Sequence, residues 1–175
     1  MRIGNGRGSR ALKTVLLSVR PEFAEAILTG EKRYEFRKRP FPVDVFEVFI
    51  YATSPSKRIL GRFTVAHVAV TTPAGAWLNF GREGAIDKKR FLSYYATRDV
   101  AICIRVGRVD RASHGVDLRR VLPSFHAPQS FRYVDARSRQ RILRSFRNPT
   151  RAVGHTRHRN RGRRRRPGTP KARML

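Results

Sequence analysis

Acidic residues stop abruptly at Asp135, and this feature limits most strongly what the chain can fold into. From residue 136 to residue 175 the sequence holds 14 Arg, one Lys and neither Asp nor Glu. Nine of these 40 residues are apolar, too few to offset the entropy lost when a core is ordered. We therefore predict a flexible basic arm over 1–12, a folded domain over 13–135 and a disordered Arg-rich tail over 136–175.

The charge of the chain is +27, of which the predicted tail supplies +15 and the rest of the chain +12. The run Arg163, Arg164, Arg165 and Arg166 is the densest part of that charge, and it predicts non-specific, salt-dependent binding of nucleic acid. Two alternatives remain open. The tail could bind DNA in a regulatory protein whose domain senses a small effector. It could also be an out-of-frame or newly extended reading of GC-rich coding sequence, which would give the same composition.

Several classes of protein are excluded by simple counts. No stretch approaches the roughly 18 consecutive apolar residues of a membrane span. The only cysteine, Cys103, lies between Ile102 and Ile104, so it can form no internal disulfide and predicts a core thiol in a reducing compartment, the cytoplasm. His155 and His158 have no acidic or cysteine neighbours. We therefore expect neither a metal site nor a cofactor.

Apolar patterning predicts strands and short helices in mixed order. Pro21 and Gly30 have the positions of a first helical residue and a C-terminal cap. Beyond that helix, alternation and short apolar runs predict further elements. The strands are expected at 15–19, 32–37, 45–52, 59–70 and 100–109, and further helices at 74–80 and 88–95. Only the first strand–helix–strand step could be a parallel crossover, so the pattern favours a small, curved, barrel-like mixed sheet.

Three groups of residues carry a family resemblance in the right order. They are Leu17–Pro21 with Ile27–Lys32 and Tyr34–Arg37, then Ile50–Gly61, and last Pro128–Tyr133. Over about residues 13–134 the chain resembles an ASCH domain, a branch of the PUA-like superfamily. The resemblance implies an α+β fold in which a mixed β-barrel of five to six strands carries flanking short helices. It also implies a cleft that binds RNA or a nucleotide-like ligand.

The candidate ligand-binding residues lie near the ends of the first predicted strands; they are Arg20, Lys32, Glu35, Arg37, Thr53 and Ser54. Arg20 precedes a helix start, where backbone N–H groups favour an anion. Alternation puts Glu35 on one face with Arg33 and Arg37, and puts Lys32 on that face only if the strand begins after it. The plainer alternative is a solvated strand face with weak ion pairs.

We expect binding rather than catalysis, with two enzymatic alternatives. Some ASCH proteins resemble amidohydrolases that act on N4-acetylcytidine through a lysine, a threonine and a glutamate. Lys32 matches the lysine, Glu35 replaces the threonine, and Glu83 is the candidate for the glutamate. A ribonuclease is the other alternative, because basic side chains near a phosphate can support phosphodiester cleavage. Among the aromatic residues, Trp77 is the first candidate for stacking on a base.

Overall fold

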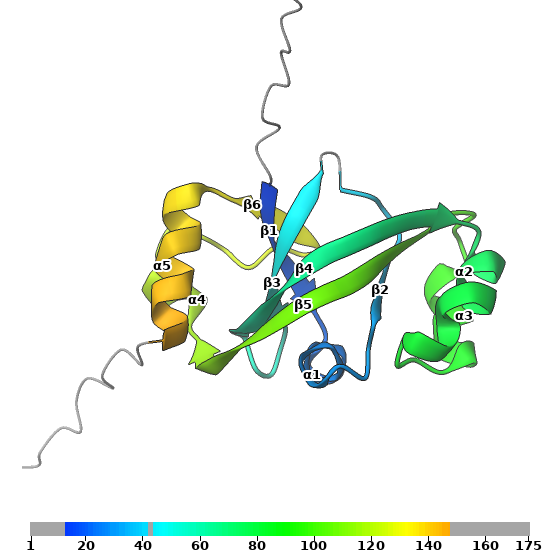
Figure 1. Cartoon of the computed structure of the whole chain (residues 1–175), viewed down its shortest axis with the longest axis horizontal. Helices are drawn as coiled ribbons and strands as arrows, with labels where there is room; N and C mark the ends of the chain where they lie inside the picture. Colours follow the sequence, from blue (N-terminus) through cyan, green and yellow to red (C-terminus); the bar gives the residue numbers. More distant parts are fainter. Residues whose placement is uncertain (1–12, 42–43, 148–175) are drawn as a thin grey trace, which may run out of the picture.

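The computed structural model describes residues 13–41 and 44–147 (Figure 1). Up to residue 109 the strands and helices follow one another in the mixed order that the sequence predicts, and further elements come after residue 116. The elements are β1 (Lys13–Val19), α1 (Pro21–Thr29), β2 (Tyr34–Arg37), β3 (Val45–Ala52), β4 (Arg58–Thr71), α2 (Pro73–Phe80), the 3-10 turn η1 (Gly81–Glu83), α3 (Lys88–Tyr95), β5 (Ala101–Val116), α4 (Leu118–Val121), β6 (Phe131–Val134) and α5 (Ala136–Arg147).

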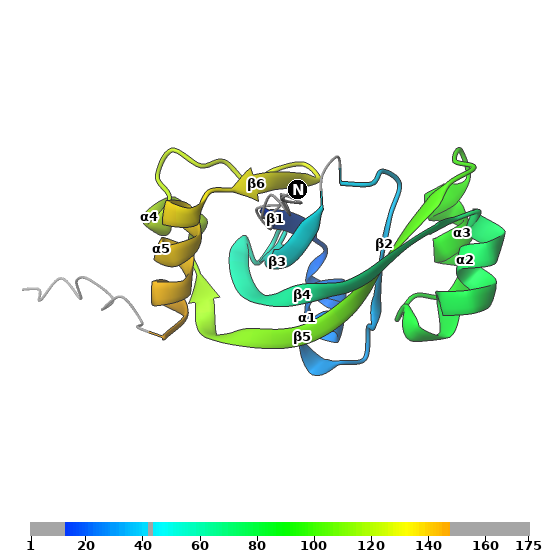
Figure 2. The same cartoon turned by 45° about the horizontal axis from the view of Figure 1, so that its top comes forward.

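The strands form one mixed sheet in the order β2-β5-β4-β3-β1-β6. β1 and β3 are parallel, and the other neighbouring pairs are antiparallel. The sheet is strongly curved (Figure 2), but the α+β fold is not the closed barrel that the sequence suggested. Its two edge strands, β2 and β6, have four residues each and are not neighbours in the sheet. An open seam therefore remains between them.

Helix α1 is built as its terminal residues predict. Pro21 is the first residue, and Gly30 ends the helix at φ 82°, a conformation that costs glycine little. The helix buries Ala24 and Ile27 against the sheet. On the sheet side, Gly61 of β4 leaves the space that this packing needs, because a Cβ there would lie 2.5 Å from the Leu28 side chain. The helix thus packs closely on the β3 and β5 side of the sheet.

Helix α5 corrects the predicted start of the disordered tail. The lack of acids predicts that residues 136–147 belong to that tail, yet they form a helix that buries Ile142 and Phe146 against Phe49 and its neighbours. The two apolar residues are four apart, so they lie on one face of the helix together with Arg139, whereas Arg137, Arg141 and Arg144 occupy the opposite face. The folded domain therefore continues beyond Asp135. The arm 1–12 and the remaining tail, including Arg163 to Arg166, lie outside the described residues.

A buried carboxylate joins α5 to the sheet. Glu47 of β3 is 2 % exposed and accepts hydrogen bonds from Arg62, from Arg139 (Nε–Oε2 2.5 Å) and from Thr14. Burial would raise the pKa of Glu47, but the hydrogen bonds and charges of Arg139 and Arg62 outweigh it and lower that pKa. Arg139 of α5, a helix without acidic residues, is thus paired with a carboxylate of the central strand β3.

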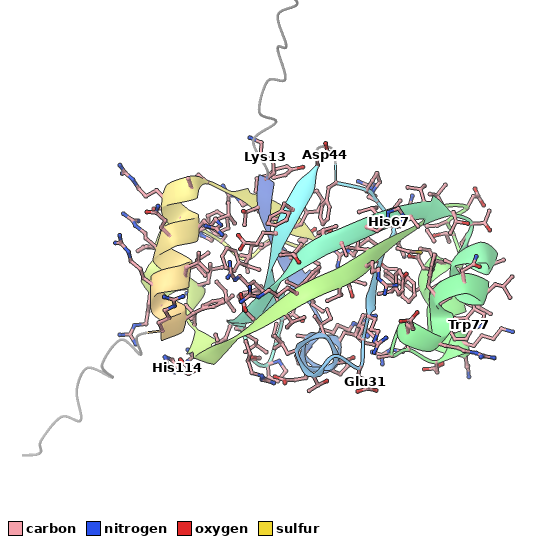
Figure 3. All side chains as sticks on the ribbon, in the orientation of Figure 1. Lys13, Glu31, Asp44, His67, Trp77 and His114 are labelled. Carbon is pink, nitrogen blue, oxygen red and sulfur yellow. The ribbon has the colours of Figure 1, made fainter. Side chains whose placement is uncertain are left out.

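Two further expectations concern single residues. Cys103 is a buried free thiol, and burial raises its pKa to about 11, which confirms a core role. Trp77 is half-buried and packs against Phe91, with the two ring centroids 5.2 Å apart. It lies at the α2–α3 end of the molecule (Figure 3). Among the described residues, no helix is long and apolar enough to cross a membrane.

Candidate functional site

A pocket of about 630 Å³ lies along the seam between the end of β1, the start of α1, β2 and α3. Its walls combine basic, acidic, hydroxyl and aromatic side chains. They come from Ser18, Val19, Arg20, Phe23, Lys32, Glu35, Phe36, Arg37, Thr53, Ile86, Arg90, Phe91, Ser93, Tyr94 and Gln129. One wall is formed by the edge strand β2, and Gln129, which comes just before the other edge strand β6, lines the pocket as well.

Lys32 is the most deeply placed cation of this pocket, with 2 % of its surface exposed. Its Nζ donates a hydrogen bond to the carbonyl oxygen of Gly84 at 2.5 Å and lies 3.7 Å from Oε2 of Glu35. The rings of Phe23 and Phe36 lie 4.8 and 5.0 Å from the same nitrogen. β2 begins only at Tyr34. Lys32 thus precedes the strand alternation, which lets it reach the same side as Glu35.

The environment of Lys32 changes its acidity. Burial lowers the pKa of its ammonium group below the ordinary 10.5, and the nearby charge of Glu35 offsets only part of this effect. Desolvation disfavours the charged form of an amine, so a buried lysine gives up its proton more readily than an exposed one. A lysine of this kind can donate or accept a proton nearer to neutral pH.

Arg37 bridges the open seam with its guanidinium group. Nη2 donates to the Ser130 hydroxyl at 2.6 Å, and Nη1 donates to the Ser18 carbonyl oxygen at 3.1 Å. Nη1 also lies 3.4 Å from Oε1 of Glu35. The Ser18 hydroxyl in turn donates to the carbonyl oxygen of Pro128 at 2.5 Å. A side-chain network therefore replaces the strand pairing that would have closed the barrel.

Helix α3 contributes residues that the sequence analysis did not assign to the site. Asp87 caps this helix through the Arg90 N–H at 2.8 Å. The Arg90 side chain reaches Glu22 of α1 at 2.5 Å and lies over the Phe23 ring at 4.8 Å. Tyr94 borders the pocket as well, with the Lys38 ammonium 4.6 Å from its ring. The cluster Lys88–Arg90 after a cap residue was the available sequence signal.

The structure separates the predicted site residues into two groups. Arg20, Lys32, Glu35, Arg37 and Thr53 all border the pocket. Ser54 is exposed in the turn after β3 and is not part of the lining.

Glu83 and Arg33 also lie outside the pocket lining. Their side chains pair with each other at 3.7 Å and are 38 % and 65 % exposed. Glu83 therefore does not join Lys32 as the glutamate of the amidohydrolase pattern would. Arg33 does not share the face of Glu35 either, because it precedes β2.

The arrangement suits a phosphate and its neighbouring sugar and base. Arg20, Arg37 and Arg90 supply cationic donors for phosphate oxygens, while Lys32 and Glu35 form a pair that can exchange a proton. Phe23 and Tyr94 offer ring surface. No group of three or more His, Cys, Asp or Glu side chains with the geometry of a metal site occurs among residues 13–41 and 44–147.

Comparisons with known proteins identify relatives of the same fold. An ASCH domain-containing ribonuclease from Zymomonas mobilis is 28 % identical over 134 residues, which span 75 % of this chain and 90 % of that protein. The crystal structure of ASCH from Zymomonas mobilis superposes with a TM-score of 0.71 at 25 % identity, covering 75 % of this chain and 94 % of that one.

A more distant structure, a hypothetical protein from Leishmania major, shares the fold at 13 % identity with a TM-score of 0.52. It covers 80 % of this chain and 98 % of its own. The family model for the ASCH domain matches residues 17–112, which begin within β1 and end within β5. The chain therefore belongs to the ASCH domain family.

Proposed function

We propose that this protein is a ribonuclease that binds single-stranded RNA in the seam pocket and cleaves its phosphodiester backbone there. The observation that carries the proposal is the buried Lys32–Glu35 pair, with 3.7 Å between Nζ and Oε2, next to the Arg37 guanidinium group. The arrangement combines a proton-exchanging pair with a cation for the phosphate. Such a combination serves cleavage, because groups whose pKa values are shifted by burial and by a charged partner gather at sites where protons are exchanged.

The reaction uses the 2′-hydroxyl group of the RNA itself. Its oxygen attacks the adjacent phosphorus while the Glu35 carboxylate takes the hydroxyl proton. The bond from phosphorus to the 5′ oxygen breaks, and that oxygen takes a proton from the Lys32 ammonium group. The products are a 2′,3′-cyclic phosphate and a 5′-hydroxyl end. Proton transfer from Glu35 back to Lys32 then restores both groups.

Arg37 and Arg20 have the complementary role of holding the phosphate. Charge builds up on the phosphate oxygens as the 2′ oxygen attacks, and fixed cationic donors stabilise that charge. Arg37 is suited to this because its side chain is held from two sides, by Ser18 and Ser130, and is only 14 % exposed. Its orientation is therefore set before RNA binds, which reduces the cost of reorganisation.

The Zymomonas mobilis relative supports the same proposal, since it is named a ribonuclease and aligns with this chain over 90 % of its length. The amidohydrolase alternative lacks this support. Its threonine is replaced by Glu35, and the Glu83 side chain pairs with Arg33 instead of lining the pocket.

The test compares matched substrates with the full-length protein. A short single-stranded RNA should be cut to products with 2′,3′-cyclic phosphate and 5′-hydroxyl ends, identified by mass spectrometry. The same RNA with one 2′-deoxy nucleotide should stay intact at the bond after that nucleotide. Cleavage at this bond would contradict the mechanism. An unchanged RNA together with deacetylation of N4-acetylcytidine would replace the proposal by the amidohydrolase.

A further inference from the structure

A second pocket, of about 790 Å³, lies between β6, α5 and the segment that joins α4 to β6. We propose that this β6–α5 groove binds the flank of the same RNA strand whose cleavage site occupies the seam pocket. The inference rests on the proposed ribonuclease function and adds a second subsite to it. Four features carry it, namely charge, the cationic face of α5, exposed aromatic surface and continuity with the first pocket.

The charge of the groove suits a phosphate backbone. Lys13 at the start of β1 (Figure 3), Arg132 of β6 and Arg141 of α5 all line it. The lining also contains one acid, Asp135, whose carboxylate accepts hydrogen bonds from the Ser138 N–H at 2.9 Å and from the Ser138 hydroxyl at 2.7 Å. This carboxylate is thus engaged in capping α5. The three cations are left to attract phosphates.

Helix α5 extends the cationic surface beyond the groove. Arg137 and Arg144 are exposed and lie four residues before and three residues after Arg141. Residues at these spacings share one helix face. The opposite face is the one that packs on the sheet through Ile142 and Phe146. Helix packing therefore fixes a row of three arginines along the rim of the groove.

Aromatic rings give the groove surface for bases. Tyr133 is 37 % exposed, and its ring is held edge-to-face by Phe131 with the centroids 5.8 Å apart. The guanidinium of the preceding residue, Arg132, lies over the Phe125 ring at 4.5 Å, and Phe125, Arg132 and Tyr133 all line the groove. A fixed, partly exposed ring beside cations is the usual platform of single-strand binding, because every base can stack on it.

The two pockets are connected by one short segment. Gln129 lines the seam pocket and Ser130 is bound to Arg37 there, whereas Arg132 and Val134 line the β6–α5 groove. From Ser130 to Val134 an extended chain spans about 13 Å, close to the length of four stacked nucleotides. Figure 2 shows β6 at the top of the molecule, running toward α5. An RNA strand that leaves the seam pocket along β6 would therefore enter the groove.

Two double variants of the full-length protein test this path. One is Arg132→Ala with Arg141→Ala. The matched control is Arg33→Ala with Arg108→Ala, which removes the same charge from exposed side chains that line neither pocket. The probe is a labelled 2′-O-methyl RNA of about ten nucleotides, which cannot be cut by 2′-hydroxyl attack. Its binding is followed by fluorescence anisotropy at several salt concentrations, and thermal unfolding confirms that each variant is folded.

The groove variant should lose two phosphate contacts. The slope of log affinity against log salt should then become shallower by about 1.4, at about 0.7 per contact, and the control should keep the wild-type slope. Tyr133→Ala should weaken binding about fivefold or more through lost stacking. A groove variant that matches the control in slope and affinity would overturn the proposal. The proposal would also be overturned if the groove variant bound RNA like wild type and differed from it only in self-association or in binding to anionic vesicles.

Cleavage of unmodified RNA separates this inference from the proposed function. The groove variant should raise KM for a ten-nucleotide RNA and leave kcat and the cleavage of a dinucleotide near wild-type values, because a dinucleotide fills only the seam pocket. Equal loss on both substrates would overturn the two-subsite arrangement. If the wild-type protein cuts neither RNA, the ribonuclease proposal fails, and the salt slope still decides whether the groove binds RNA.

Discussion

Replacing Ile142 by alanine tests whether α5 is an integral part of the domain. Ile142 is fully buried in the cluster that contains Leu16, Phe49 and Ile59, so its truncation removes apolar contacts and leaves a cavity. Such changes cost about 2–5 kcal/mol of unfolding free energy. Alanine has the higher helix propensity by a few tenths of a kcal/mol. A lower free energy of unfolding for Ile142→Ala would therefore reflect lost packing of α5 on the sheet and not a weaker tendency to form the helix.

Urea unfolding of the full-length protein gives the measurement. With a slope of about 2 kcal/mol per molar urea, a loss of 2 kcal/mol lowers the midpoint by about 1 M. Arg144→Ala is the matched control on the same helix, since Arg144 is exposed and its replacement should cost less than about 0.5 kcal/mol. If the midpoints of the two variants agree within about 0.2 M, α5 does not pack on the sheet, and the domain ends near Asp135.

Three other contacts lead to predictions of their own. Glu47→Gln should lower the free energy of unfolding by about 1–3 kcal/mol at pH 7. Because the pKa of Glu47 is lowered in the fold, the difference in unfolding free energy between wild type and variant should be largest above pH 5 and shrink as acid protonates the wild-type carboxylate. A gap in urea stability that is constant from pH 7 to pH 3 would contradict this. The kcat/KM of RNA cleavage should fall as the pH rises, with the midpoint of the fall below pH 10.5, the ordinary pKa of lysine. The reason is that the reaction needs the protonated form of Lys32, and burial lowers the pKa of this residue. A midpoint at or above pH 10.5 would contradict the role of Lys32 as the acid. Gly61→Ala should cost about 1–3 kcal/mol, because the new Cβ would lie 2.6 Å from the Asp110 carbonyl oxygen; an unchanged thermal midpoint would show that the two strands can separate there at little cost.

Much of the fold was predictable because local signals agree with it. Pro21 and Gly30 set the ends of α1, and Asp87 sets the start of α3, since these effects act within one helical turn. The open sheet was not predictable in this way. Whether the edges of a curved sheet meet depends on accumulated twist and strand length, and here the Arg37 side chain spans the seam where strand hydrogen bonds would have closed it.

The start of the tail was misjudged for a related reason. Composition shows that residues 136–175 contain no acid, but Arg139 finds its partner in Glu47, 92 positions earlier. The amphipathic spacing of Ile142 and Phe146 was the local signal, and the density of arginine obscured it. An average taken over all 40 of these residues cannot distinguish the 12-residue helix at their start from the residues after it.

The candidate site was predicted in part. The residues near the ends of β1 and β3, and those within and just before β2, could be identified because short connections keep them close, and five of the six proposed ligand-binding residues line the pocket. The contribution of α3 depends on how the long β4–β5 pair carries α2 and α3 around the sheet (Figure 1). No local pattern in the sequence encodes that path, so the sequence could not place Arg90 and Tyr94 beside Lys32.

The role of Lys32 is tested most directly by the initial rate of RNA cleavage after Lys32→Met. Methionine keeps most of the buried stem and removes the proton. Loss of a positioned acid slows such reactions about 10²–10⁴-fold. Arg33→Met is the matched control, since it removes the neighbouring charge from an exposed side chain. We predict a fall in kcat of at least about 100-fold for Lys32→Met, with folding intact by thermal unfolding, and a rate within about twofold of wild type for Arg33→Met. Equal rates for the two variants would contradict the account.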